Sequence, residues 1–363
     1  MIVTTPVARA GLLARFPELA RYGRTATRLH PRPGLPSAQQ SSVGGPLLWP
    51  GDEAWPTCTL PHPVQKQRCE TEEEAARRHG HWEETKRRQW AHVAELESLS
   101  DRIAPEVLAR ARASAATPPP VTVPGSVTWH EYELLREPVR LVPVLQLHRG
   151  ETSAVPFPDG TDLLQLLWCP SSHEHHGPAA RGFWRNAASV TDPLPVMPEP
   201  NHVQRDGFVP RPCLVHPEDV VEYPPTCLAP RHDEHYTRFG MMPAELEDAV
   251  RLWSEGQPED ADYDILSQAP GWKAGGWDPC SADTGLLRTC ACGARMRPLL
   301  STSYSEWLHL WPPQGDPGFV WGDPARRQDR EPTGINFTRS GDYLVLYCPA
   351  DPQRHPLSHA TPH

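Results

Sequence analysis

The spacing of hydrophobic and polar residues differs from one part of the chain to another, and the longest regular pattern is that of a helix. Between Val64 and Ala116 the sequence is dense in Glu, Arg, Ala and Gln, and apolar residues recur every three or four positions. Oppositely charged pairs four residues apart, such as Glu84 with Arg88, suit the solvated face of a helix. The proline-rich run TPPPVTVPG then ends this segment, so we predict a helical segment over 64–116.

Two shorter patterns also predict helices. Near the N-terminus, Leu12, Phe16 and Leu19 fall on one helical face, although Pro17 must kink or restart the helix. A second helix is predicted to begin after Pro243 and to run over 244–254, because proline favours the first helical turn.

Short apolar runs bounded by Gly, Pro or Asp predict strands on either side of a proline-rich stretch. These runs are VRLVPVLQLH (139–148), TDLLQLLWC (161–169), ARMRPLLS (294–301) and GDYLVLYC (341–348).

The chain is also similar to itself. GGPLLWPGDEAWPTC (44–58) and GGWDPCSADTGLLRTC (275–290) each precede two of the predicted strands. The distance from Cys58 to Cys169 exceeds that from Cys290 to Cys348 by 53 residues, which is the length of the predicted helical segment. We therefore expect an internal duplication with a helical insertion in its first copy.

This organisation predicts an α+β fold of two related β-rich lobes. The predicted parts are an N-terminal helix and extended arm (1–42), a first lobe (43–200) with its helical insertion (64–116), a proline-rich connector with one helix (201–270), and a second lobe (271–363).

Composition narrows the class of protein. The chain has 363 residues, of which 45 are proline, so a fully helical bundle is not expected. A net charge of −10 gives no basic field for nucleic acid or an anionic membrane, and no run of 18 apolar residues could span a bilayer. Nine cysteines, an odd number in a long chain, favour a cytoplasmic protein with reduced thiols or metal ligands.

The second lobe has a cysteine pattern typical of a structural zinc site. Cys290 and Cys292 flank Ala291 ahead of the permissive Gly293, and Cys348 follows the last predicted strand. For the fourth ligand the sequence offers Cys280, Asp351 and His355, and no motif selects among them.

The first lobe offers a second set of four zinc ligands. Cys58 with His62 and Cys169 with His173 both have the spacing C-x3-H. The alternative is that Cys169, beside Trp168 at a strand end, is a plain core residue. A zinc ion with four protein ligands has no open position for substrate, so we expect a structural role for both sites.

Trp82 and Trp90 lie on one side of the predicted helical segment. Either this helix is solvated and lies on the body of the protein, or it projects as an arm whose tryptophans bind a partner. The sequence contains no nucleophile elbow, phosphate-binding loop, dinucleotide fingerprint, H-E-x-x-H or calcium-binding loop.

Several blocks together resemble the YwqG-like bacterial family, an uncharacterised group, in its long actinobacterial form. The chain is distantly similar as well to the programmed cell death protein 2 family, which is linked to zinc binding and to escort of a ribosomal protein. The family pattern has C-x-x-C where this chain has Cys290 and Cys292, and a further Cys shortly after Cys348. The resemblance implies a zinc-binding fold and brings no enzyme activity with it. The blocks are SSVGGPLLWPGDEAWP (41–56), PVLQL (143–147), GTDLLQLLWCP (160–170), APGWKAGGW (269–277), CACGARMRPLL (290–300) and GDYLVLYCP (341–349).

These features favour a non-enzymatic, chaperone-like protein that binds a protein partner through a cleft between the lobes and through the helical arm. A hydrolase with its active site in that cleft, or an immunity protein that occludes a toxin, are the alternatives. Shifted pKa values in a concave site would favour the hydrolase, whereas a groove lined by tryptophan would favour binding. The sequence pattern specifies no oligomeric state.

Overall fold

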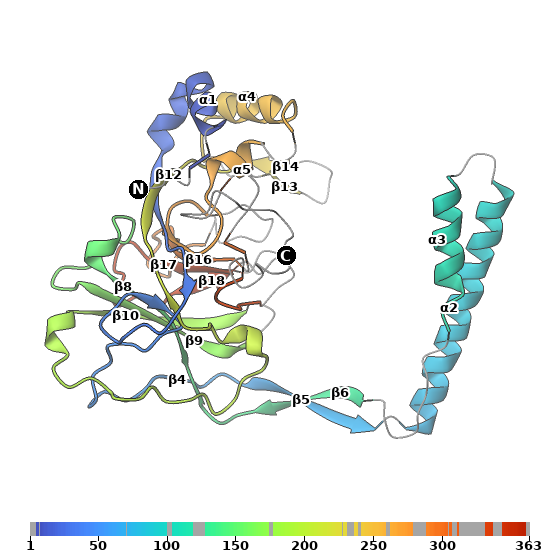
Figure 1. The fold of residues 1–363 in the computed structure, drawn as a ribbon, viewed down its shortest axis with the longest axis horizontal. Coiled ribbons are helices and arrows are strands. Elements are labelled where there is room, and N and C mark those ends of the chain that lie inside the picture. Colours follow the sequence, from blue (N-terminus) through green and yellow to red (C-terminus); the bar gives the residue numbers. More distant parts are fainter. Residues whose placement is uncertain are drawn as a thin grey trace. The chain divides into compact units, whose positions relative to one another are not determined.

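A computed structural model gives the fold of the chain and divides it into two compact units (Figure 1). The first unit comprises residues 1–62 and 136–363, and the second comprises residues 63–135. Each unit is described by itself. The structure describes residues 5–6, 8–69, 71–99, 104–118, 128–173, 177–226, 228–230, 236–238, 241–258, 262–278, 288–303, 305–306, 311, 331–336 and 343–360.

Two six-stranded sheets, both antiparallel, form the centre of the first unit. Sheet A has the order β12-β1-β15-β16-β17-β18, and sheet B has the order β10-β9-β8-β3-β11-β2. The strands of sheet A are β1 (Arg24–Arg28), β12 (Glu218–Glu222), β15 (Lys273–Gly275), β16 (Arg297–Thr302), β17 (Tyr343–Tyr347) and β18 (Ser358–Ala360). The strands of sheet B are β2 (Arg32–Pro33), β3 (Ser42–Val43), β8 (Val142–His148), β9 (Leu163–Ser172), β10 (Pro178–Arg185) and β11 (Cys213–Leu214).

The two sheets have equivalent connectivity. In sheet B the chain runs through β3, β8, β9 and β10 as neighbours, and in sheet A it runs through β15, β16, β17 and β18 in the same way. The middle pair of each of these four-strand runs, β8 with β9 and β16 with β17, contains a register shift that begins at a proline, Pro143 in one and Pro298 in the other. Proline cannot donate to the ladder, which explains why both irregularities fall there.

Each half of the chain also contributes one strand to the sheet that is formed mainly by the other half. Strand β1 lies in sheet A while β2, four residues later, lies in sheet B; β11 lies in sheet B while β12 lies in sheet A. Consequently β1 separates β12 from β15, and β11 separates β2 from β3. The two crossing segments occupy equivalent positions in their sheets.

One hydrophobic core joins the two sheets. It contains Val144 and Leu166 from sheet B together with Leu300 and Val345 from sheet A, all almost inaccessible to solvent. The Trp168 and Tyr343 rings meet edge to face, 5.6 Å apart, across the core. The segments predicted as two lobes therefore form two layers of one unit, and their described inner faces are packed with side chains.

A helical layer covers a smaller core of its own. Its elements are α1 (Ala8–Arg15), the 3-10 helix η1 (Pro17–Tyr22), α4 (Ala244–Ser254) and α5 (Tyr263–Ser267). Buried Leu12, Leu19, Val250 and Leu266 from these four elements pack together. The predicted restart at Pro17 is present, and α4 has the predicted bounds with Leu246, Val250 and Trp253 on the packed face.

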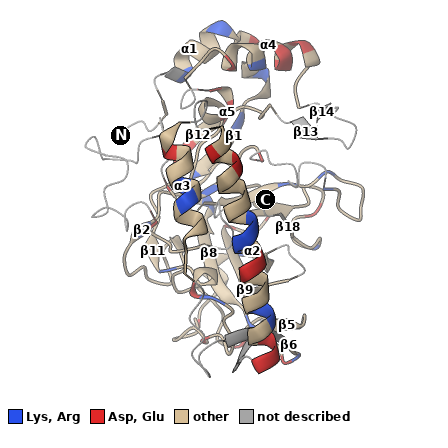
Figure 2. Cartoon of the chain, turned by 90° about the vertical axis from the view of Figure 1, so that its right-hand side faces the viewer, with Lys and Arg blue, Asp and Glu red and all other residues tan. Residues whose placement is uncertain are grey.

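The second unit is a helical hairpin with a strand at each end. The helix predicted over 64–116 is wrong at its start, because pairing with β6 (Thr128–Leu135) places residues 64–69 in strand β5 (His62–Cys69). The rest of the segment contains α2 (Glu72–Ser98) and α3 (Pro105–Ala115). Thr71 and Glu74 form a capping box at the start of α2, and Arg112 of α3 pairs with Glu97 of α2 at 2.6 Å. Charges of both signs follow one another along α2 (Figure 2).

The remaining elements are short. They are β4 (Thr57–Cys58), which pairs with β7 (Val139–Arg140); β13 (Leu228–Pro230), which pairs with β14 (Tyr236–Arg238); and the 3-10 helices η3 (Arg149–Glu151), η4 (Ala187–Ser189) and η5 (Asp206–Phe208). Within the described ranges, no helix has the length and apolar character that a bilayer crossing requires.

Candidate metal centres

The Gly-Gly turns that open the two halves are backbone positions that exclude a side chain. Gly44 has φ +62°, and a Cβ there would lie 2.5 Å from the carbonyl oxygen of Pro210. Gly276 has φ +77°, and a Cβ there would lie 2.3 Å from Oε2 of Glu222. A positive φ and an oxygen atom this close both exclude a residue with a side chain, so glycine is required at each position.

The first cluster consists of Cys58, His62, Cys169 and His173, which are all buried. Cys58 ends β4, His62 begins β5, Cys169 lies in β9 and His173 directly follows β9. Their ligand atoms lie within 4.8 Å of one another. The structure therefore brings together the four residues that the sequence predicts for the first lobe, and they could hold a metal ion.

His62 provides an independent sign that this first cluster is a ligand site. Its side chain is inaccessible to solvent, yet neither Nδ1 nor Nε2 has a hydrogen-bond partner. An imidazole buried without a partner is costly, and a metal ion would satisfy one of its nitrogens. His173 lies beside it, with ring centroids 5.1 Å apart.

The cysteines of the first cluster share a proton in a way that suits a thiolate ligand. Cys169 and His173 make hydrogen bonds to Cys58 that lower the pKa of its thiol to about 3, although burial opposes this shift. The same hydrogen bond to Cys58, together with burial, raises the pKa of Cys169. Cys58 is thus the more readily ionised thiol of the pair, and a bound cation would favour the thiolate form of both cysteines.

The second cluster consists of Cys290, Cys292, Cys348 and His355. Cys290 and Cys292 lie in a tight loop, in which Gly293 has φ +85° and donates to the carbonyl of Cys290 at 2.8 Å. Cys348 follows β17 directly. Cys292 is exposed and His355 half-buried, so this cluster is more open to solvent than the first.

Among the three candidates for the fourth ligand of the second cluster, the structure selects His355. Its Nδ1 lies 3.1 Å from Sγ of Cys348. Burial raises the pKa of Cys348, but hydrogen bonds from His355 and backbone amides outweigh it and bring the pKa to about 6. Cys280 lies outside the described residues, and Asp351 is not part of the cluster.

One distance in each cluster falls in the range expected for four-coordinate geometry. Bonds of 2.0–2.3 Å in a tetrahedron place ligand atoms about 3.3–3.8 Å apart. The distance from Cys58 Sγ to His173 Nε2 is 3.5 Å, as is that between the Sγ atoms of Cys292 and Cys348. Since all ligand atoms of each cluster lie within 4.8 Å of one another, the four side chains could close around a single ion.

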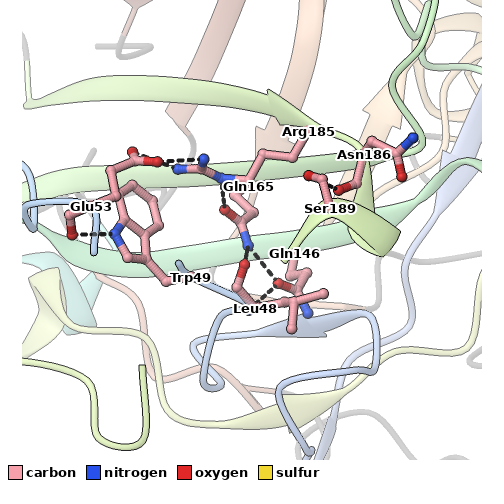
Figure 3. Close-up of polar contacts among 8 residues, drawn as sticks. All are labelled: Leu48, Trp49, Glu53, Gln146, Gln165, Arg185, Asn186 and Ser189. Carbon is pink, nitrogen blue, oxygen red and sulfur yellow. Dashed lines mark hydrogen bonds and ion pairs between the residues drawn. The ribbon is translucent and has the colours of Figure 1, made fainter. Parts of the chain in front are cut away.

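A buried polar network, which the sequence pattern did not predict, fixes the loop that leads to Cys58 (Figure 3). Gln165 donates to the carbonyl of Leu48 and to Gln146, and accepts from Arg185. Arg185 forms two short hydrogen bonds with Glu53, at 2.6 and 2.7 Å. The sequence indicated this network only through one glutamine, Gln146 or Gln165, inside each of two otherwise apolar predicted strands.

In the second half Glu222 fixes the equivalent turn. Its carboxylate accepts from the backbone amides of Ala269 and Trp277 and pairs with Lys273 at 2.5 Å. Both charged side chains are buried, which requires this pairing.

The two tryptophans predicted to bind a partner lie on α2 in the second unit. Trp90 is 49% exposed and Trp82 is half-buried, and together with Glu83, Lys86 and Arg87 they line a shallow hollow. Two helical turns separate the indoles, with Lys86 midway between them. His79 stacks on Trp82 with ring centroids 5.7 Å apart.

No protein-family model and no curated protein matches this chain.

Proposed function

We propose that the chain is a non-enzymatic binding protein whose two Cys/His clusters each hold a structural zinc ion. Thiolate and imidazole ligands suit zinc, and two cysteines with two histidines, or three with one, are common structural sets. The orphaned nitrogens of buried His62 are the observation that most favours a resident ion. Four protein ligands leave no open coordination position, which favours a structural role over a catalytic one.

We further propose that the two halves arose by internal duplication. The matching strand orders of the two sheets support it, as does the presence of a cluster cysteine in or directly after the equivalent strands, Cys169 in β9 and Cys348 after β17. Membership of the YwqG-like family is part of the same proposal and rests on the motifs that Gly44, Cys169, Gly275 and Cys348 anchor.

The proposed binding surface is the helical hairpin, through Trp82 and Trp90. Exposed indoles are among the side chains that contribute most to protein interfaces, and these two lie on one side of a long, otherwise charged helix. The described inner faces of the two sheets are packed against each other, so the proposal relies on the hairpin and not on a cleft between lobes. We infer a protein partner that presents an apolar side chain to the hollow between the indoles. Reduced, zinc-bound cysteines would place this function in the cytoplasm.

The test compares partner capture by three forms of the full chain. The double variant Trp82→Ala/Trp90→Ala should lose the captured protein, and the matched variant Val107→Ala, which truncates a 50% exposed residue of α3, should keep it. The purified partner should then bind the intact chain directly, with affinity reduced tenfold or more by Trp90→Ala. Equal capture by the double variant and the intact chain would refute the proposed surface.

A further inference from the structure

A cavity of about 250 Å³ opens at one end of sheet A, on residues that the metal clusters and the helical hairpin do not use. Several adjacent strands contribute to it, because antiparallel neighbours bring the start of one strand beside the end of the next. Its lining residues are Arg24, Met241, Trp277, Asp278, Arg295, Met296, Arg297, Pro298 and Pro349.

Three arginines make this cavity strongly positive in a protein whose net charge is −10. Arg24 begins β1 and Arg297 begins β16, and both are exposed, so a ligand from solvent can reach them. Neither makes an ion pair with any described residue. Desolvation, followed by the positive charges of Arg297 and Arg295, lowers the pKa of Arg24 to about 10, as expected where like charges are neighbours.

The position of Arg24 is fixed before any ligand arrives. Its guanidinium lies 3.4 Å from the centroid of the Trp277 ring. That indole is held in turn, because its Nε1 donates to the carbonyl of Tyr22 and its backbone amide donates to Glu222. A guanidinium stacked on a fixed aromatic ring retains its fork of donors for an oxyanion.

Asp278 places a second requirement on the ligand, which is a hydrogen bond to its buried carboxyl group. It is 3% exposed, and neither carboxylate oxygen has a hydrogen-bond partner. Burial raises its pKa to about 7, against the attraction of Lys273 and Arg295. A buried carboxyl group without a partner costs free energy, and a ligand that offers it a hydrogen bond recovers part of that cost.

We propose that this cavity binds a phosphate group, with Arg24 and Arg297 on its charged oxygens and one proton shared between the Asp278 carboxyl group and a phosphate oxygen. A phosphate monoester has its second pKa at about 6 and is therefore basic enough to share this proton, whereas sulfate is a far weaker base and accepts it poorly. The site would therefore select phosphate over sulfate.

The walls of the cavity indicate that the phosphate belongs to a small organic molecule. Trp277 and Met296 are buried and apolar, and Met241 and Pro298 add to that surface. The volume is several times the share of about 30 Å³ that one water takes in the liquid, so there is room for a substituent beside the phosphate. We assign the ligand to the class of small phosphate monoesters.

Isothermal titration calorimetry of the intact chain at pH 7 tests the site with inorganic phosphate, phenyl phosphate and sulfate. We expect saturable binding of one phenyl phosphate per chain, weaker binding of inorganic phosphate and little binding of sulfate. Arg24→Gln and Arg297→Gln should each weaken phenyl phosphate binding at least tenfold. The exposed strand residue Arg181, on β10, gives the matched control Arg181→Gln, which should leave binding unchanged.

The variant Asp278→Asn separates the carboxyl requirement from the charge requirement. An amide can donate to a fully ionised oxyanion, so the preference for phosphate over sulfate should shrink at least fivefold. An unchanged preference would overturn the role given to Asp278. Equal binding of inorganic phosphate and phenyl phosphate would overturn the assignment to monoesters, and absence of saturable binding of all three anions at millimolar concentration would overturn the site.

Folding and the proposed function are controlled separately in this experiment. Each variant is checked by circular dichroism, and Arg297→Gln carries the test if Arg24→Gln does not fold. The variant Trp90→Ala should bind phenyl phosphate normally, because the cavity and the helical hairpin belong to different units. Failure of this site would therefore leave the hairpin proposal standing, and the reverse also holds.

Discussion

Nε2 of His173 lies 3.5 Å from Sγ of Cys58, although 115 residues separate them in the chain. The contact joins the end of a sheet B strand to the short strand β4, on which Cys58 lies. An ion at this point would therefore link segments that are distant in sequence, and its removal should affect the whole first unit.

The first prediction concerns zinc content and stability. Elemental analysis of the purified chain should give about two zinc ions per molecule, and Cys58→Ser should reduce this to one. Its free energy of unfolding should fall by about 4 kcal/mol or more, because metal-binding energy is folding energy.

The matched control for this variant is Cys213→Ala, which changes a buried cysteine of β11 outside both clusters. It should retain both ions. A chain that contains no zinc, or a Cys58→Ser variant that retains two ions, would contradict the assignment.

The second prediction concerns the order in which the two ions leave. Cys292 is exposed, whereas all four residues of the first cluster are buried. Chelation in excess EDTA, followed with a colorimetric zinc indicator, should therefore be biphasic, with the Cys290 cluster responsible for the fast phase. Cys292→Ser should remove the fast phase alone; loss of the slow phase instead would reverse the assignment.

The third prediction concerns the polar network around Gln165. Gln165→Leu leaves the carbonyl of Leu48 and the Nε of Arg185 without their partner, so we expect a loss of about 2–3 kcal/mol in chemical denaturation. The exposed Gln39 provides the control, since Gln39→Leu should change stability by less than about 0.5 kcal/mol. Similar stabilities for the two variants would show that the network contributes little.

The fourth prediction concerns the pH dependence of stability. Burial raises the pKa of Glu306 to about 7, although the backbone amide of Trp272 and the charges of Arg28 and Arg32 oppose this shift. The folded state thus holds a proton that the unfolded chain releases above about pH 4.5. The contribution of this group is therefore fully present below pH 4.5 and is lost as the pH rises toward 7.

The variant Glu306→Gln should remove that dependence. Between pH 5 and pH 8 it should gain stability relative to the intact chain by on the order of 2 kcal/mol, measured by urea denaturation at each pH. Glu95→Gln, at a 72% exposed position, should follow the intact chain throughout. Parallel curves for Glu306→Gln and the intact chain would contradict the shift.

Local patterns predicted the elements whose formation depends on neighbouring residues. The bounds of α4 follow from Pro243 and the spacing of Leu246, Val250 and Trp253, and the structure has them as predicted. The sequence predicted all four residues of the first cluster and three of the second, Cys290, Cys292 and Cys348, because Cys and His near strand ends are few and regularly spaced. The choice of His355 required the structure, since its selection depends on how the chain turns after β17.

Long-range contacts were not predictable from such patterns. Nothing in the sequence around Arg24 or Asp278 indicates a shared cavity, because strands from distant parts of the chain bring them together. The separate lobes expected from the repeat were replaced by two layers with one core, since spacing along the chain does not say which sheet a strand joins. The network of Gln146, Gln165 and Arg185 was missed for the same reason.

The exchange of β1 and β11 between the sheets has a consequence for how the first unit folds. Among the described strands, β2 has β11 as its one neighbour in sheet B, and β12 has β1 as its one neighbour in sheet A. Each half of the chain alone would therefore leave one of its strands unpaired. The first unit should consequently unfold as a whole and should not separate into two independently folding halves.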